Sequence, residues 1–293
     1  MYLPISILAF FLNGIAVTVD KFLITKTIPD PLIYIFYFSL ISFVALLGIP
    51  FTSMPTNEVF FLASTSTIFW TTGAYFMFWA LKIGQVQRVI PVIGSLIPLF
   101  LLAISFPTGG IIQNQAVAVL TLILGLIFLT LPELRGKLLL KELVFEVWSA
   151  LFFALAYLLL REAFLKQDFL TVLIWSRPIL IPLGIAILLV PVTREKVLSI
   201  TKQAGSLKKA GLLFAGGQAA AGVSEILLLF AISLANPTLV NSLQGIKYVF
   251  LLIFALILGR KYPNIFKIQK VGWELLTTVL GIILIGIGLT LLV

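Results

Sequence analysis

Two apolar segments, each about twenty residues long, meet at Asn236-Pro237 within residues 211–260. An apolar α-helix of this length crosses the hydrocarbon core of a bilayer, so the segments predict two membrane-spanning helices. One segment carries Glu225 and the other Lys247, and the helical rise places both roughly 12 to 14 Å from the shared turn. A charge inside a membrane span is costly unless it is paired or faces a wet cavity. We therefore expect this pair to mark a functional site.

The composition also favours an integral membrane protein. Hydrophobic residues make up 61% of the chain and charged residues 11%, whereas soluble domains are roughly half apolar and a quarter charged. The sequence has no Cys and no His, which excludes disulfides, thiolate nucleophiles and the commonest metal ligand. We expect no metal and no cofactor, and a carboxylate as any proton carrier. The net charge of +9 comes from bases in short loops, so we expect no nucleic-acid partner.

Pro, Gly and charged residues divide the rest of the chain into further apolar segments. The expected fold class is an all-α polytopic membrane protein with ten transmembrane helices. The loop at 191–210 holds either an amphipathic surface helix or a charged linker. The predicted spans are residues 3–23, 32–51, 58–82, 86–106, 114–131, 143–161, 169–190, 211–233, 238–258 and 271–292.

Lys and Arg residues are distributed unevenly between alternate loops. Apart from Arg177 and Lys247 inside spans, they follow spans one, three, five, seven and nine, Lys21 included, with Arg161 and Lys166 as the exceptions. Basic loops resist translocation and stay in the cytoplasm. We predict a multi-pass protein of the cell membrane, with both termini external and the loop after span seven in the cytoplasm.

The two halves of the sequence resemble each other. Residues 79–100 align with residues 230–251, and residues 10–23 align with residues 152–165. Five spans per half is an odd number, so successive halves enter the membrane in opposite senses, and an inverted-topology repeat is predicted. Such repeats are typical of secondary transporters, whose substrate site lies near the bilayer midplane.

Several segments are similar to the EamA branch of the drug/metabolite transporter superfamily. They are ALKIGQVQRVIPVIGSLIPLFLLAI at 80–104, FLTVLIWSRPILIPL at 169–183 with Arg177 inside the membrane, and QKVGWELLTTVLGIILIGIGLTLL at 269–292. The resemblance implies a carrier that exports or exchanges amino acids, related metabolites or drugs by alternating access.

The same resemblance implies a division of the chain into two inverted five-helix repeats. The first EamA-like repeat covers 1–131, a connecting loop covers 132–142, and the second repeat covers 143–293. The expected partners are a small-molecule solute and the lipid bilayer, and the expected state is a monomer or a homodimer.

Three ionisable residues lie at one predicted depth. Arg177 is eight residues into its span, roughly 12 Å from the outer side, which is the layer of Glu225 and Lys247. The layer carries one net positive charge, and Arg binds carboxylates through two hydrogen bonds, so we expect an anionic substrate group. Glu225 is the only acid that we expect inside a span, which makes it the proton-coupling candidate. The alternative is a structural network that locks three helices together.

Polar and aromatic residues add to this layer. Gln218 shares a helical face with Glu225, and Gln244 shares one with Lys247, while Asn13 lies within the first span. Tyr75 and Trp175 are expected to wall the pocket. The predicted substrate-binding residues are Arg177, Lys247, Gln244, Gln218, Asn13, Trp175 and Tyr75.

Prolines interrupt two of the predicted spans. Pro removes a backbone hydrogen bond and permits a kink, which suits a helix that bends during gating but also occurs in static bundles. The predicted kink positions are Pro91, Gly94, Pro98, Pro178 and Pro182.

Other classes of function fit the composition less well. Metal-dependent hydrolysis needs several acids or His together, and no nucleotide-binding motif occurs, so we do not expect an enzyme. The alternatives to a carrier are a lipid flippase, an intramembrane enzyme acting on lipids, and a structural membrane subunit.

Overall fold

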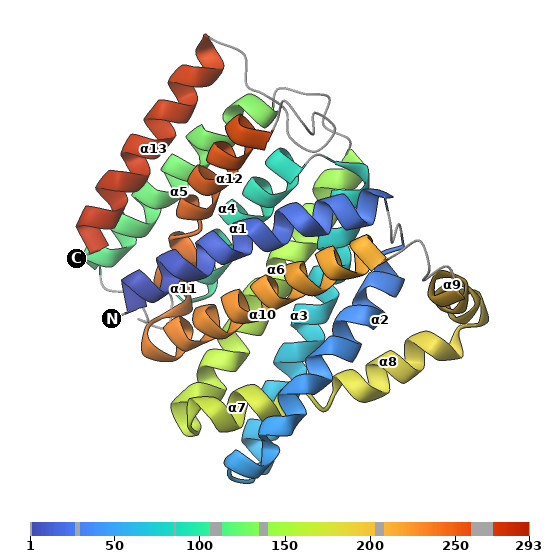
Figure 1. The fold of residues 1–293 in the computed structure, drawn as a ribbon. Helices are drawn as coiled ribbons and strands as arrows, with labels where there is room; N and C mark the ends of the chain where they lie inside the picture. Colours follow the sequence, from blue (N-terminus) through green and yellow to red (C-terminus); the bar gives the residue numbers. More distant parts are fainter. Residues whose placement is uncertain are drawn as a thin grey trace.

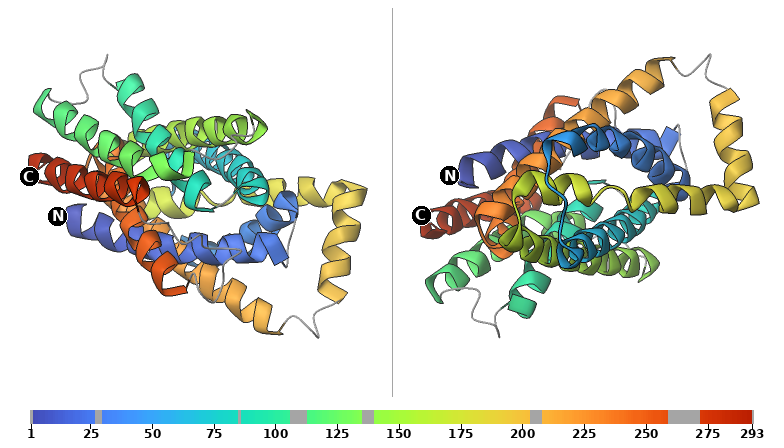
Figure 2. Two further views of the ribbon diagram at one scale, coloured as in Figure 1. Left: turned by 90° about the horizontal axis from the view of Figure 1, so that it is seen from above. Right: turned by 90° about the horizontal axis from the view of Figure 1, so that it is seen from below.

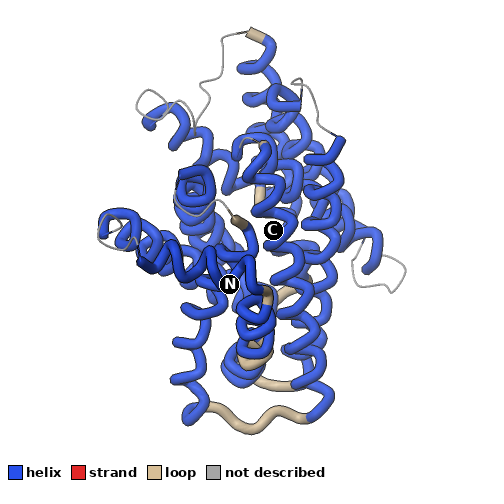
Figure 3. Tube along the Cα trace, turned by 90° about the vertical axis from the view of Figure 1, so that its right-hand side faces the viewer, coloured by secondary structure: helices blue, strands red, loops and turns tan. Residues whose placement is uncertain are grey.

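The protein folds as a bundle of α-helices. The computed structural model describes residues 2–26, 30–84, 86–105, 113–134, 140–202, 208–258 and 272–292. Helices joined by short connections occupy nearly all of these ranges, which hold no strand, and this confirms the all-α fold class (Figure 3). The elements are α1 (Tyr2–Lys26), α2 (Pro31–Ser42), the 3-10 helix η1 (Phe43–Phe51), α3 (Asn57–Ile83), α4 (Val86–Ser105), α5 (Gln113–Leu134), α6 (Leu140–Lys166), α7 (Phe169–Trp175), α8 (Leu180–Leu189), α9 (Pro191–Lys202), α10 (Lys208–Leu234), α11 (Pro237–Ser242), α12 (Gly245–Leu258) and α13 (Trp273–Leu292).

Several of these helices have the length and composition of membrane spans. In the described part of the chain, five helical stretches are long and apolar enough to cross a membrane. Large apolar side chains such as Phe51, Phe61 and Leu212 are exposed on the outside of the bundle, as a lipid-facing surface requires. The five stretches are Tyr2–Ile24, Pro31–Phe51, Leu140–Lys166, Phe169–Leu189 and Leu212–Leu234.

The bundle is built from three long helix pairs. α3 packs along α6, α5 along α13, and α1 along α10 (Figure 1). Small side chains let the backbones approach, because Ser66 Oγ donates a hydrogen bond to the Ala156 carbonyl at 2.8 Å and Ser149 Oγ donates to the Gly73 carbonyl at 2.9 Å. Between α5 and α13, a Cβ on Gly125 would lie 2.9 Å from a carbonyl oxygen. Close packing of this kind holds helices together where lipid removes the hydrophobic drive.

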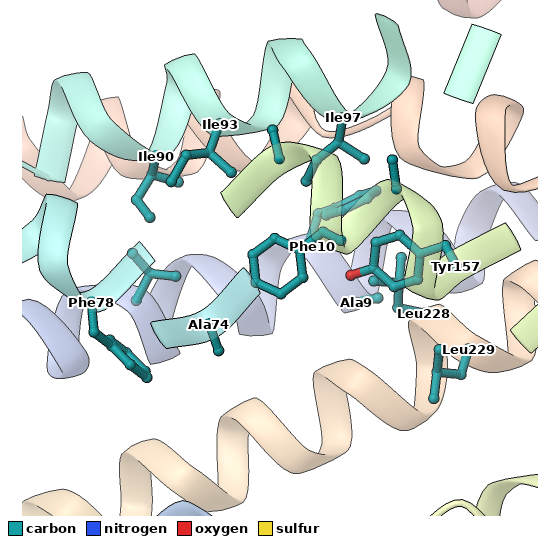
Figure 4. Close-up of a cluster of buried hydrophobic side chains, with 14 of the residues drawn as sticks. Ala9, Phe10, Ala74, Phe78, Ile90, Ile93, Ile97, Tyr157, Leu228 and Leu229 are labelled. Atoms are coloured by element: carbon teal, nitrogen blue, oxygen red, sulfur yellow. The ribbon is translucent and has the colours of Figure 1, made fainter. Parts of the chain in front are cut away.

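The centre of the bundle is apolar on its α4 side. Ile90, Ile93 and Ile97 follow one another along one face of α4 and are each almost fully buried. Figure 4 shows them facing Phe10 of α1 and the Tyr157 ring of α6. This part of the interior is held by van der Waals packing and has few polar groups to bind a solute.

Helix α9 lies at the end of the molecule opposite the chain termini (Figures 1 and 2). Of the two alternatives for the 191–210 loop, α9 supplies the helix, while residues 203–207 lie outside the described residues. Lys196 Nζ forms an ion pair with Asp30 Oδ2 at 2.8 Å, and Asp30 caps the start of α2. α9 is therefore attached to the bundle by a contact at the first turn of α2.

Three predicted spans differ from the sequence expectation. Residues 32–51 change from α-helix to 3-10 helix after Ser42, and residues 169–190 and 238–258 are each divided into two helices. The connecting loop expected at 132–142 is shorter, because α5 continues to Leu134 and α6 begins at Leu140. These changes concern the internal continuity of the three segments and the length of the connection.

Candidate functional site

Arg177 lies in the interruption between α7 and α8. Residues 176–179 leave the helix, and Pro178 has no N–H to continue the hydrogen-bond ladder. The backbone turns through the interruption with the Arg177 N–H bonded to the Ile174 carbonyl at 3.1 Å and the Leu180 N–H bonded to the Arg177 carbonyl at 2.9 Å. Arg177 is half-buried as a residue and lies among packed helices.

A second interruption separates α11 from α12. α11 starts at Pro237 behind the side-chain cap of Asn236, and runs for six residues before the chain turns at Leu243 and Gln244. Bonds to the third preceding residue carry the backbone through the turn, with the Gln244 N–H on the Asn241 carbonyl at 3.1 Å. No proline stands at this turn, so a different cause must interrupt the helix.

Lys247 is the centre of a buried polar cluster just after that turn. Its Nζ donates hydrogen bonds to Asn13 Oδ1 at 3.2 Å and to Gln244 Oε1 at 3.3 Å. Gln244 in turn donates to Asn241 Oδ1 at 3.1 Å, and Lys247 Nζ lies 5.4 Å from the centre of the Tyr248 ring. The structure thus brings together three predicted substrate-binding residues, which are Asn13 of α1, Gln244 of the turn before α12 and Lys247 of α12.

The sequence left open whether Glu225 pairs with Lys247. No ion pair joins the two in the described residues, and the cation that acts electrostatically on Glu225 is Arg177. The physical reason is the interruption before α12, which leaves Lys247 bonded to α1 while Arg177 approaches α10 from the α7–α8 side. The equal predicted depth of Glu225 and Lys247 was therefore not enough to predict which cation acts on Glu225.

An aromatic wall stands beside Glu225. Trp70 of α3 and Tyr157 of α6 both interact with this region, and Trp70 stacks on Phe38 at 5.0 Å between ring centroids. The Trp70 Nε1–H lies close enough to interact with Glu225 and Tyr157, but makes no hydrogen bond of good distance and angle with any described residue. On α10, Gly222 is exposed one turn before Glu225, and a Cβ built on it would meet nothing within 4 Å.

Two predicted aromatic residues lie elsewhere. Trp175 Nε1 donates to Thr52 Oγ1 at 3.2 Å, which ties the end of α7 to the residue after η1. Tyr75 makes edge contacts with its neighbours Phe76 and Trp79. No contact in the described residues links either side chain to Lys247, and the sequence could not show this because helical depth does not specify which face an aromatic ring occupies.

The prolines predicted as kink positions behave differently in different helices. α4 continues from Val86 to Ser105 with Pro91 and Pro98 inside it, whereas Pro178 lies in an interruption and Pro182 lies within α8. Gly94 has a separate role, because a Cβ there would lie 1.6 Å from the Tyr248 hydroxyl. The glycine lets Tyr248 reach across to the Ile90 carbonyl, to which it donates at 2.8 Å.

Gln218 belongs to a polar group that the sequence did not predict. The Tyr34 hydroxyl donates a short hydrogen bond to Asp20 Oδ1, and Gln218 Nε2 donates to the same oxygen at 3.4 Å and to the Tyr34 oxygen at 3.2 Å. Asp20 is only 7% exposed, which corrects the expectation that Glu225 is the only buried acid. Its position seven residues after Asn13, on the same face of α1, is the sequence signal that could have revealed it.

Two further buried acids and one lysine depart from expectation. Glu142 and Glu146, in the first turns of α6, are almost fully buried. Lys21, which the charge count assigned to the first loop, lies within α1 and donates to the carbonyls of Leu81 at 2.7 Å and Gly84 at 2.8 Å. Lys21 therefore connects α1 to the end of α3 and does not lie in a loop.

Comparison with known proteins shows the fold and leaves the function open. No family model matches the chain, and no curated protein matches it. A solved structure described only as "Crystal structure of protein" superposes with a TM-score of 0.62 at 14% identity, covering 98% of this chain and 97% of its own. The arrangement of helices along the whole chain therefore recurs in an experimentally determined protein.

Proposed function

We propose that this protein is a secondary membrane transporter of the EamA type, which moves a small organic solute bearing a carboxylate across the cell membrane by alternating access. Ten membrane spans, arranged as two inverted repeats of five, are part of the proposal. The observation that carries it is the pair of interrupted helices whose breaks hold Arg177 and lead into Lys247.

Interrupted helices at membrane depth have a restricted use. Non-helical backbone is tolerated there only where it is buried in protein or lines a water-filled cavity, because lipid offers no hydrogen bonds. In secondary transporters, discontinuous helices form the substrate and ion sites near the bilayer midplane. Arg177 is half-buried at one such break, and the exposed Gly222 lies on the neighbouring helix α10.

The packing of the helices supports an inverted repeat. If α1 corresponds to α6 and α3 to α10, as the order of spans requires, the pair α1 with α10 exchanges with the pair α6 with α3. The third long pair, α5 with α13, corresponds to itself under the same exchange. A pseudo-twofold relation between the halves produces this pattern, and it is the relation that alternating access uses.

The charges favour a solute with a carboxylate. Arg177 and Lys247 are two cations, and Glu225 supplies one opposing charge beside Arg177. A guanidinium binds a carboxylate through two parallel hydrogen bonds, while the aromatic wall of Trp70 and Tyr157 offers an apolar surface for the rest of the solute. The cytoplasmic side in this proposal is the side of α9, opposite both termini (Figure 2).

The test replaces the guanidinium of Arg177, which donates two parallel hydrogen bonds, by an ammonium of the same charge. Proteoliposomes containing the purified protein are screened for uptake of amino acids and organic acids, and Arg177→Lys is compared with the wild type on the solute that is transported. Loss of a bidentate contact worth about 1.5 to 3 kcal/mol should lower uptake by roughly ten- to a hundredfold. Arg194→Lys, the same substitution on exposed α9, is the matched control and should transport as the wild type does.

Two results would contradict the proposal. If folded and inserted wild-type protein transports none of the carboxylated solutes, this class of substrate is excluded. If Arg177→Lys protein has normal uptake, Arg177 does not bind the solute and has a structural role. Scrambling of fluorescent lipids by the same proteoliposomes, without solute uptake, would favour the flippase alternative.

A further inference from the structure

Asp20 is a buried carboxyl held entirely by neutral partners. It lies on α1, accepts hydrogen bonds from the Tyr34 hydroxyl of α2 and the Gln218 amide of α10, and is 7% exposed. Gln218 also bonds to the Tyr34 oxygen at 3.2 Å, so the three side chains form a closed triangle between three helices. No cation among the described residues forms an ion pair with Asp20.

Several charged groups on the surrounding helices bond to other partners, and α10 adds Glu225, on which the charge of Arg177 acts. On α1 itself, Lys21 donates to carbonyls at the end of α3. On α12, Lys247 bonds to Asn13, and on α3, Lys82 lies 4.8 Å from the centre of the Trp79 ring while Glu58 bonds to Lys166 of α6. The described part of α11 carries no charged residue.

We propose that Asp20 is the proton-binding residue that couples transport to a pH gradient, with Tyr34 and Gln218 as the partners that respond to its protonation. The inference rests on the proposed transport function. A buried carboxylate without a counter-ion is the kind of group that binds a proton when its surroundings change. Arg177 opposes protonation of Glu225 by its charge, and no such cation faces Asp20.

The protonation step changes hydrogen bonds between three helices. A hydronium ion from the open side transfers its proton to a carboxylate oxygen of Asp20 and leaves as water, so the ionised side chain becomes a neutral acid. With the proton on Oδ2, Oδ1 still accepts from Tyr34 and Gln218, but both hydrogen bonds weaken because the oxygen no longer carries negative charge. The contacts of α1 with α2 and α10 therefore differ between the two forms.

The geometry also links this site to the solute site. Asn13, which bonds to Lys247, precedes Asp20 by seven residues on α1, and Gln218 precedes Glu225 by seven on α10. Seven residues are two turns, or about 10 Å along a helix, and keep the side chains on one face. Two mutually packed helices thus carry both sites, so a shift at one is transmitted to the other.

The first experiment uses Asp20→Asn, which has the shape of the protonated acid. In proteoliposomes with a gradient of one pH unit, coupling of one proton to one solute gives about tenfold accumulation in the wild type. Asp20→Asn should show no accumulation while it still exchanges solute across the membrane. Asp30→Asn, an exposed aspartate at the start of α2, is the matched control and should accumulate as the wild type does. Accumulation by Asp20→Asn equal to the wild type would overturn the proposal.

A second readout does not require transport. Infrared titration of the purified protein follows the carbonyl band of protonated carboxyl groups, and one component should vanish in Asp20→Asn and persist in Asp30→Asn. Tyr34→Phe removes one hydrogen-bond donor to the carboxylate and should move that component to higher pH, which keeps the test open if Asp20→Asn fails to fold. A wild-type protein that transports no solute but loses this band in Asp20→Asn would refute the transport proposal and keep the proton site. An unchanged titration in both variants would refute the proton site.

Discussion

Helix α4 and the pair α11 and α12 occupy equivalent places in the two halves of the sequence, yet only the second is interrupted. α4 is continuous over Val86–Ser105 although it contains Pro91 and Pro98. The equivalent segment breaks at Leu243 and Gln244, where no proline is present. Proline is thus neither sufficient nor necessary for the interruption in this bundle.

The two segments differ in the polarity of one face. In the sequence alignment of the two halves, the buried Ile90 and Ile93 and the half-buried Leu96 of α4 stand where the second half has Asn241, Gln244 and Lys247. The isoleucines pack in the apolar interior seen in Figure 4, whereas the polar residues bond to one another and to α1. The Asn241 side chain also donates a hydrogen bond to the Pro237 carbonyl at 2.9 Å. In a helix this oxygen normally accepts from a backbone N–H, so the side chain competes with the backbone for it.

The difference lies in which side chains accompany a continuous helix and which accompany an interrupted one. Side chains that compete with the backbone for hydrogen bonds are found at the interruption, and apolar side chains preserve the helix even around proline. The half with the interruptions is the half that carries Arg177, Glu225 and Lys247.

The largest effect is expected when Lys247 is replaced by leucine, the residue at the aligned position of the first half. Lys247→Leu, which copies Leu96, removes the cation and leaves the oxygens of Asn13 and Gln244 without their donor. Uptake of a carboxylated solute should fall by roughly ten- to a hundredfold, because a charged hydrogen bond is worth about 1.5 to 3 kcal/mol.

Uptake and folding must be separated in that experiment. Protein yield after gel filtration is measured in parallel, and Lys166→Leu, on an exposed lysine that pairs with Glu58, serves as the matched control. Full uptake by Lys247→Leu would show that the polar face of α12 has no part in solute binding.

A smaller effect is expected at the contact between the two equivalent helices. Gly94→Ala places a Cβ 1.6 Å from the Tyr248 hydroxyl, so one helix must shift, at a cost of about 1 to 3 kcal/mol. The thermal midpoint of unfolding in detergent should fall, and the added change Tyr248→Phe, which removes the nearest atom, should restore part of it. Gly184→Ala is the control, since a Cβ there meets nothing within 4 Å. Equal midpoints for the two alanine variants would contradict the close contact.

The smallest effect concerns the caps on which short helix pieces depend. Asp168 caps the seven-residue α7, and hydrogen bonds from the Thr171 side chain and backbone hold the pKa of Asp168 below its ordinary value. A lowered folded-state pKa means that the stabilisation is present at neutral pH and is lost as the pH falls through that pKa. The thermal midpoint of the wild type should decrease on acidification by the equivalent of at most about 1 kcal/mol.

The asparagine variant separates charge from capping in the same measurement. Asn caps a helix nearly as well as Asp but does not titrate in this range, so Asp168→Asn should lose the acid-dependent component and keep the rest. An identical pH profile in both proteins would exclude Asp168 as its source.

Apolar run length was enough to predict where the helices lie, because burial in lipid demands long, internally bonded helices. Interruptions were harder to predict, since Pro91 and Pro98 gave the same signal as Pro178 and a different outcome. Charge partners could not be predicted from depth, because the face and neighbour of a side chain depend on how helices pack. The charge of Arg177, and not that of Lys247, acts on Glu225, and Asp20 was missed.

The most direct test of the central proposal asks whether a solute binds against α10 beside Glu225. The chain contains no cysteine, so Gly222→Cys provides a single thiol one turn before Glu225. Gly216→Cys is its matched control, since a Cβ there also meets nothing within 4 Å but lies nine residues from Glu225, on the opposite side of α10. We expect a transported carboxylate to slow maleimide labelling of Gly222→Cys and to leave labelling of Gly216→Cys unchanged. Equal labelling of Gly222→Cys with and without solute would contradict the account.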